Sequence, residues 1–185
     1  MTVLEVTHSQ TEVDISTLVK KMESKIPEIT DYTYNHRARL IKPMLSYDAA
    51  AIALTFLPAA GGDGSDGRDP NADGYTYHHL RRDIYALSKS TGIEIESRYV
   101  VPSSHLTIAR FVSRKDFTNA DTGALDKQKI EDVVGKLVSI NHDLQAEDES
   151  AQTETWQVGE GKGLVCRTGT VWYGGGQSQH EGRGF

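Results

Sequence analysis

Apolar residues recur with a helical period in three stretches of the chain, separated by stretches with other patterns. Between residues 11 and 26 they follow one another at three- and four-residue steps, and residues 77–90 and 126–144 repeat this spacing. Thr11, three residues before Asp14, can cap the first of these segments, and Pro27 should end it. The pattern therefore predicts three amphipathic helices over 11–26, 77–90 and 126–144.

Shorter segments with β-branched or alternating residues precede and follow these helices. Residues 1–7 resemble a short strand, and 37–44 and 47–57 resemble two strands joined through the segment Pro43–Ser46. We expect further strands at 104–112, 155–158, 163–167 and 170–173, and an extended segment at 93–101. Strands interspersed with helices and joined by short links predict an α+β fold with antiparallel sheets.

Two segments lack any periodic pattern. Residues 59–74 contain five Gly and four Asp with few apolar side chains, which predicts a flexible surface loop inserted within one fold. The tail of residues 174–185 begins with three consecutive glycines, and we expect it to be mobile. A length of 185 residues suits one domain or two small, closely packed lobes.

Composition narrows the class of protein. With 37% hydrophobic residues the chain can build a core, so wholesale disorder is excluded. A net charge of −6 argues against a grip on long nucleic acid, because such binding depends on clustered Lys and Arg. A single cysteine, Cys166, excludes an intrachain disulfide. No long apolar stretch or secretory signal is visible, so we expect no membrane association and a cytoplasmic or nuclear location.

The strand predicted at 104–112 carries the most informative chemistry. Side chains alternate along a strand, so His105 and Thr107 share one face and Leu106 and Ile108 should face the core. An imidazole can move a proton near neutral pH, and a hydroxyl can donate to a phosphoryl oxygen. By itself the pair is a weak signal, because a strand that carries a half-buried histidine is the more frequent explanation. The same alternation places Arg110 on the opposite face, where packing, an ion pair or substrate contact are all open.

These residues resemble a known signature. The segment SSHLTIARF is similar to the second His-x-Thr motif of the 2H phosphoesterase superfamily, which includes 2′-5′ RNA ligase-like proteins and cyclic nucleotide phosphodiesterases. Nearly the whole chain resembles a fungal branch of that superfamily, through DYTYNHRARLIKPMLSYDAAAIALTF, YTYHHLRRDIY, VPSSHLTIARF and GKGLVCRTGTVWYGGG.

The resemblance implies a bilobal fold, with two antiparallel sheets and flanking helices around a central cleft. Lobe one would span about 1–101 and lobe two about 102–173. His105, Thr107 and Thr2 would be catalytic, with Thr2 and Val3 matching part of a first motif. That motif's histidine would precede Met1, so we expect an N-terminally truncated and severely impaired enzyme; a natural short protein that has lost activity is the alternative.

The mechanism that the resemblance implies needs no metal or other cofactor. Two histidines exchange protons with water and the leaving ribose oxygen, and two hydroxyls hold the phosphate. The substrate class is a 2′,3′-cyclic phosphate or a 2′-5′ phosphodiester of a nucleotide or RNA end. The alternative is a non-catalytic protein that binds nucleotides or RNA ends. A small nucleotide or RNA terminus is the expected partner, and we expect a monomer.

Other residues are ambiguous from sequence alone. Tyr173 could stack on a base or belong to the core. His36, near a strand start, could contact substrate or be structural. His79 and Asp83 have a spacing that suits a metal, but a solvated helix face is the stronger interpretation.

Overall fold

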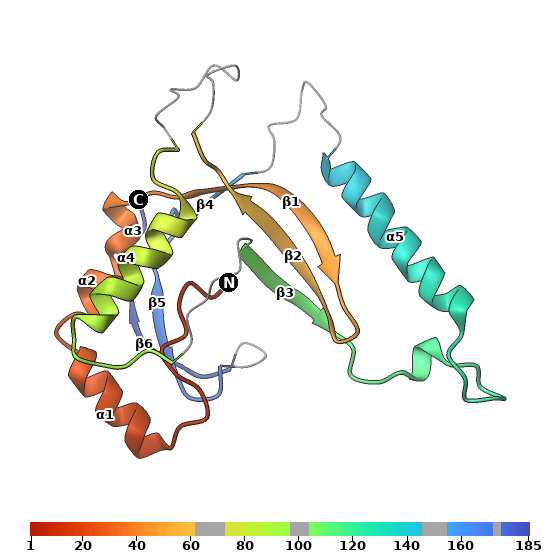
Figure 1. The fold of residues 1–185 in the computed structure, drawn as a ribbon, viewed down its shortest axis with the longest axis horizontal. Helices are drawn as coiled ribbons and strands as arrows, with labels where there is room; N and C mark the ends of the chain where they lie inside the picture. Colours follow the sequence, from red (N-terminus) through yellow and green to blue (C-terminus); the bar gives the residue numbers. More distant parts are fainter. Residues whose placement is uncertain (62–72, 97–103, 146–154, 172–174) are drawn as a thin grey trace. The chain divides into compact units, whose positions relative to one another are not determined.

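The computed structural model describes residues 1–61, 73–96, 104–145, 155–171 and 175–185 (Figure 1). The fold is mixed α+β, with a curled antiparallel sheet of order β3-β2-β1-β4 and a two-stranded sheet β5-β6. The elements in chain order are α1 (Glu12–Met22), α2 (Ile26–Thr30), α3 (Tyr32–Asn35), β1 (Arg39–Tyr47), β2 (Ala51–Pro58), α4 (Tyr77–Lys89), β3 (Ser104–Arg110), the 3₁₀ turn η1 (Lys115–Phe117), α5 (Lys127–Gln145), β4 (Trp156–Gln157), β5 (Val165–Thr168) and β6 (Gln177–Glu181).

The chain divides into two compact units, neither of which is one continuous stretch. We call the first the sheet unit; it comprises Met1, Ile41–Leu57 and Ser103–Thr155. The second, the helical unit, comprises Thr2–Leu40, Pro58–Pro102 and Trp156–Phe185. The lobe boundary predicted near residue 101 lies outside the described residues, as does most of the predicted loop at 59–74. No helix in the described residues combines the length and apolarity that a membrane span needs.

The sheet unit begins with the hairpin of β1 and β2. The sequence predicts a turn through Pro43 and Ser46, but both lie within β1 and the turn falls at Asp48. The Asp48 carboxylate accepts from the backbone N–H groups of Ala50 and Ala51 at 2.7 and 2.8 Å. An aspartate that bonds the backbone two residues ahead defines a tight turn, and this local bond outweighs the turn signal of the proline.

Helix α5 meets the hairpin through one polar side chain. The Asn141 amide accepts from the Leu45 N–H at 2.6 Å and donates to the Leu45 carbonyl at 2.9 Å. Leu137, one helical turn earlier, is buried. The helix predicted over 126–144 is confirmed, and Asn141 joins it to β1 through this pair of hydrogen bonds.

The helical unit holds most of the buried apolar residues, including Leu40, Tyr77 and Leu80. The Thr11 hydroxyl caps α1 as predicted, by accepting from the Asp14 N–H. The first helix nevertheless ends at Met22, and Pro27 lies in the first turn of the separate helix α2, where its missing N–H costs nothing. The helix predicted over 77–90 is confirmed as α4.

The strand predicted at 1–7 is wrong. The segment contains a single bridge residue, Glu5, and no regular strand. Among the described residues its backbone accepts from the Glu96 N–H at the Val6 carbonyl, at 3.2 Å, and from the Tyr77 hydroxyl at the Thr2 carbonyl, at 3.4 Å, which is not the ladder of a strand. A strand needs a neighbour along its length to pair its N–H and C=O groups, and alternation in the sequence does not supply one.

The C-terminal tail corrects a second expectation. Instead of a mobile segment, its described residues contain β6, which pairs with β5 in an antiparallel hairpin. After β6 the Arg183 N–H and guanidinium bond the Asp31 carboxylate at 2.8 and 2.9 Å. The final strand predicted at 170–173 is not formed by Thr170 and Val171, and the other two residues lie outside the described part.

Two glycines let this hairpin approach α2 closely. A Cβ added to Gly182 or Gly163 would overlap the carbonyl oxygen of Thr30, which is backbone and cannot rotate away. That carbonyl accepts from the Leu164 N–H at 2.8 Å. Glycine at these two positions therefore permits a backbone contact that any other residue would block.

We expect Gly182→Ala to lower the free energy of unfolding by about 1–3 kcal/mol, because the added methyl overpacks a backbone contact. Gly161→Ala is the matched control, since a Cβ there meets nothing within 4 Å. Urea unfolding followed by circular dichroism measures both. Equal stability of the two variants would contradict this account of the contact.

Candidate active site

The residues of the predicted His-x-Thr motif lie on β3, which pairs with β2. His105 is opposite Thr55, Leu106 opposite Leu54 and Thr107 opposite Ala53. Directly paired residues in an antiparallel sheet present their side chains on the same face. His105 and Thr107 therefore share one face of the sheet unit, as predicted.

A β-bulge then changes the direction of the next side chains. The register shifts between Ile52 and Ala53, so that Ile108 is an extra residue and Arg110 pairs with Ala51. Ala51 and Ala53 point to the same face of β2, since they are two residues apart. Arg110 accordingly shares the face of His105 and Thr107, and the prediction that it points to the opposite face is wrong. Simple alternation fails because a bulge inserts one residue into the count.

The residues on β2 that pair with His105, Thr107 and Arg110 are small or carry a hydroxyl group. Ala51 and Ala53 add little volume, so the side chains on β3 rise above them. The Thr55 hydroxyl lies 2.9 Å from both the Met44 carbonyl oxygen and the Ser46 hydroxyl, which holds it within the sheet face. We call His105, Thr107 and Arg110, with Thr55 opposite them, the β3 face.

The charge at one end of the β3 face is set by Asp48 and Arg110. Hydrogen bonds from the backbone of Ala50 and Ala51 lower the pKa of Asp48, and the positive charge of Arg110 acts in the same direction. The carboxylate therefore stays ionised near neutral pH. The guanidinium of Arg110 thus lies in the field of a fixed negative charge.

The apolar side chains of β3 are more exposed to solvent than the sequence predicts. Leu106 and Ile108, expected in the core, are 38% and 53% exposed. Ile108 is displaced because it is the bulged residue. Only Ser104, at the start of the strand, is fully buried along β3.

Thr2, the third predicted catalytic residue, belongs to the helical unit, whereas the β3 face belongs to the sheet unit. Its side chain is exposed, and its carbonyl accepts from the Tyr77 hydroxyl at 3.4 Å. Thr2 does not lie on a strand. Its placement beside a second histidine motif therefore remains a prediction.

His36 lies in an aromatic cluster of the helical unit. Its ring stacks on Tyr32 with centroids 3.9 Å apart and planes inclined by 4°. Nδ1 lies 3.1 Å from the Tyr32 carbonyl, which can only accept, so Nδ1 donates and Nε2 is left as the acceptor in neutral His36. Tyr75 lies between this histidine and His79, with ring centroids 5.5 and 5.6 Å from theirs.

His79 has the opposite hydrogen-bonding pattern. Its Nδ1 accepts from the Thr76 backbone N–H at 3.1 Å, which completes a capping box at the start of α4. Nδ1 must be unprotonated to accept, so Nε2 carries the proton in the neutral ring. His79 caps helix α4, and Asp83 accepts a hydrogen bond from a phenol, so both side chains are used without a metal. The described residues contain no group of His, Cys, Asp and Glu that could hold a metal ion.

Asp83 forms hydrogen bonds with two tyrosines of this cluster and with its neighbour Arg82. Its carboxylate accepts from the phenols of Tyr75 at 2.9 Å and Tyr32 at 3.2 Å, and pairs with Arg82 at 2.7 Å. The hydrogen bond from Arg82 lowers the pKa of Asp83. Burial, followed by the hydrogen bond to Asp83, raises the pKa of Tyr75 well above 10. The sequence shows these residues but gives no sign that Tyr75 and Asp83 meet.

The remaining candidate, Tyr173, lies outside the described residues. Comparison with known proteins adds no assignment, because no protein-family model, curated protein or solved structure matches this chain. The chemistry of the sites must therefore be argued from their own residues.

The raised pKa of Tyr75 predicts that the protein loses stability at alkaline pH. Its folded-state pKa is raised above the unfolded value of about 10, so folding favours the protonated form. This contribution is present in full below pH 10 and is lost as the pH rises above it. We expect Tyr75→Phe to unfold at lower urea than wild type at pH 8, and to lose less stability between pH 8 and 10.5.

Tyr34→Phe serves as the control, because the exposed Tyr34 hydroxyl has no hydrogen bond among the described residues. It should follow the wild type at both pH values. An identical alkaline loss in Tyr75→Phe and wild type would show that the phenol does not contribute as described.

Proposed function

We propose that the β3 face is a phosphodiester site of the 2H type, acting on the 2′,3′-cyclic phosphate or 2′-5′ phosphodiester of a nucleotide or RNA end. The observation that carries the proposal is the bulge at Ile108, which brings Arg110 onto the face of His105 and Thr107. A proton carrier, a hydroxyl donor and a guanidinium on one face of a sheet are the groups that a phosphate ester requires.

Each residue has a distinct role in this proposal. Arg110 offers two parallel N–H donors to the phosphoryl oxygens, and Thr107 adds a hydroxyl donor. His105 carries one of the two protons that hydrolysis must move. It either accepts a proton from the attacking water or returns one to the ribose oxygen as the bond from phosphorus to that oxygen breaks.

The resemblance to 2H proteins adds a second signature and a bilobal fold to the proposal, with Thr2 as a second phosphate ligand. In that superfamily a second histidine shares the proton transfers, and general acid–base catalysis contributes ~10²–10⁴-fold for each role. A non-catalytic protein that holds nucleotides or RNA ends through Arg110 and Thr107 is the second candidate function.

Hydrolysis of 2′,3′-cyclic AMP, followed by chromatography of the monophosphate products, tests the proposal. We expect His105→Gln to reduce turnover by ~10²–10⁴-fold, because it removes the proton carrier. Arg110→Ala should instead weaken binding of the cyclic nucleotide. His142→Gln is a matched control on α5, since that exposed imidazole contacts only Asp143 among the described residues.

Three outcomes separate the candidates. If His105→Gln loses turnover and the His142→Gln control keeps it, the result supports a phosphodiesterase. If wild type shows no turnover but binds 2′,3′-cyclic AMP in an Arg110-dependent way, the binding protein is favoured. Wild-type behaviour in both the His105 and the Arg110 variant would refute a phosphate site on the β3 face.

A further inference from the structure

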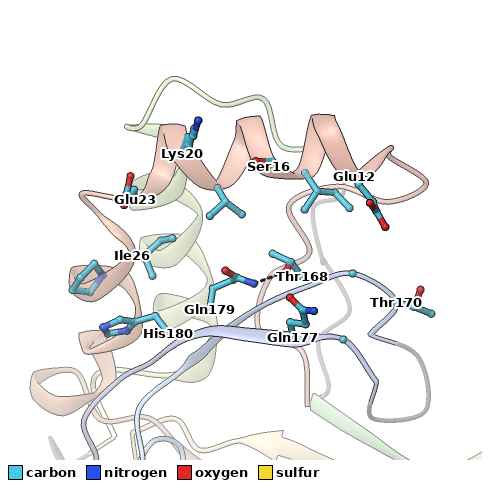
Figure 2. Close-up of a pocket in the computed structure, with 15 residues that line it drawn as sticks. Glu12, Ser16, Lys20, Glu23, Ile26, Thr168, Thr170, Gln177, Gln179 and His180 are labelled. Carbon is cyan, nitrogen blue, oxygen red and sulfur yellow. Dashed lines mark hydrogen bonds between the residues drawn. The ribbon is translucent and has the colours of Figure 1, made fainter.

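The helical unit contains a cavity that the proposed phosphodiester site does not use. It lies between α1 and the β5-β6 hairpin and has a volume of about 950 Å³ (Figure 2). Small-molecule sites in proteins typically measure roughly 300–1,000 Å³. A cavity of this size between one helix and one hairpin can therefore hold a ligand as large as a nucleoside.

The two walls of the cavity differ in chemistry. The side formed by α1 and the start of α2 contributes Ile15, Val19 and Ile26. The hairpin contributes Thr168, Gln177 and Gln179, and Figure 2 shows both glutamines rising from β6 towards α1. A ligand between these walls meets an apolar surface on one side and amide groups on the other.

The amide groups retain unused hydrogen-bonding capacity. Gln179 donates to the Thr168 hydroxyl at 2.8 Å, which leaves its carbonyl oxygen as an acceptor. Among the described residues the Gln177 side chain has no hydrogen-bond partner, so its oxygen and its NH₂ group are both available. One primary amide offers a donor and an acceptor side by side, and the complementary ligand edge carries an acceptor beside a donor.

Charges around the cavity disfavour anions. Glu12 and Glu23 contribute two carboxylates and Lys20 one ammonium group, and none of the three has an ion-pair partner in the described part of the chain. Their sum is one negative charge. A phosphate group would be repelled on balance, whereas an uncharged ligand would not be affected.

We propose that this cavity binds the adenine ring of an uncharged nucleoside. The N6 amino group and N7 of adenine form the donor and acceptor pair that a glutamine amide matches with two hydrogen bonds. The ring faces can pack against Ile15 and Val19, as aromatic ligands pack on apolar side chains. Gln177 would select the base, and the proposal stands independently of the phosphodiester site.

Titration calorimetry with adenosine, inosine and AMP tests the site on the full chain. Inosine replaces the N6 amino group by an oxygen, so the N7 edge that the proposal places against Gln177 carries two acceptors, and inosine should bind at least about fivefold more weakly than adenosine. AMP should also bind more weakly than adenosine, and the difference should shrink at high salt, because the penalty is electrostatic. No detectable binding of adenosine at millimolar concentration, or equal binding of inosine, overturns the proposal.

Gln177→Leu removes the amide while it keeps a side chain of similar size. We expect it to abolish the preference for adenosine over inosine and to leave the thermal melting curve unchanged, since the amide makes no internal bond in the described residues. Gln145→Leu, at the end of α5 in the sheet unit, is the matched control and should bind as wild type. Preserved selectivity in Gln177→Leu would contradict the role assigned to that amide.

Discussion

The helical unit depends on the close approach of two glycines to the carbonyl of Thr30. Gly163 and Gly182 permit β5 and β6 to lie against the end of α2 with no side chain between them. The Thr30 hydroxyl adds bonds to the Ile26 carbonyl and to Nδ1 of His180, each at 2.8 Å. The contact lies beside the cavity, because Ile26 at the start of α2 and His180 on β6 both line it.

In the sheet unit an insertion of one residue determines which side chains share a face of β3. Without the bulge at Ile108, alternation would direct Arg110 away from His105 and Thr107. The bulge therefore places three polar side chains on one face of β3, where alternation alone would place two. Bulges next to functional sites commonly re-aim a side chain in this way, and here the result is a guanidinium beside an imidazole and a hydroxyl.

Periodicity in the sequence was sufficient to predict α1, α4 and α5, because each of these helices has one apolar face that recurs at regular steps. It also placed His105 and Thr107 on one side of β3. It failed where structure depends on distant partners. β6 forms from a polar segment because β5 and Thr30 lie beside it, whereas residues 1–7 contain no regular strand despite their alternation. The bulge leaves no pattern in a single sequence, so the direction of Arg110 could not be predicted.

The paired hydrogen bonds between Asn141 and Leu45 bear on how copies of this protein behave in solution. In the described register, β4 pairs with β1 only at Arg39 and Leu40. The backbone groups farther along this edge of β1 could therefore pair with a strand from another molecule. The Asn141 amide occupies both the N–H and the C=O of Leu45, as a neighbouring strand would. At Leu45, therefore, the side chain of Asn141 occupies the backbone groups that a strand from another molecule would need in order to pair there.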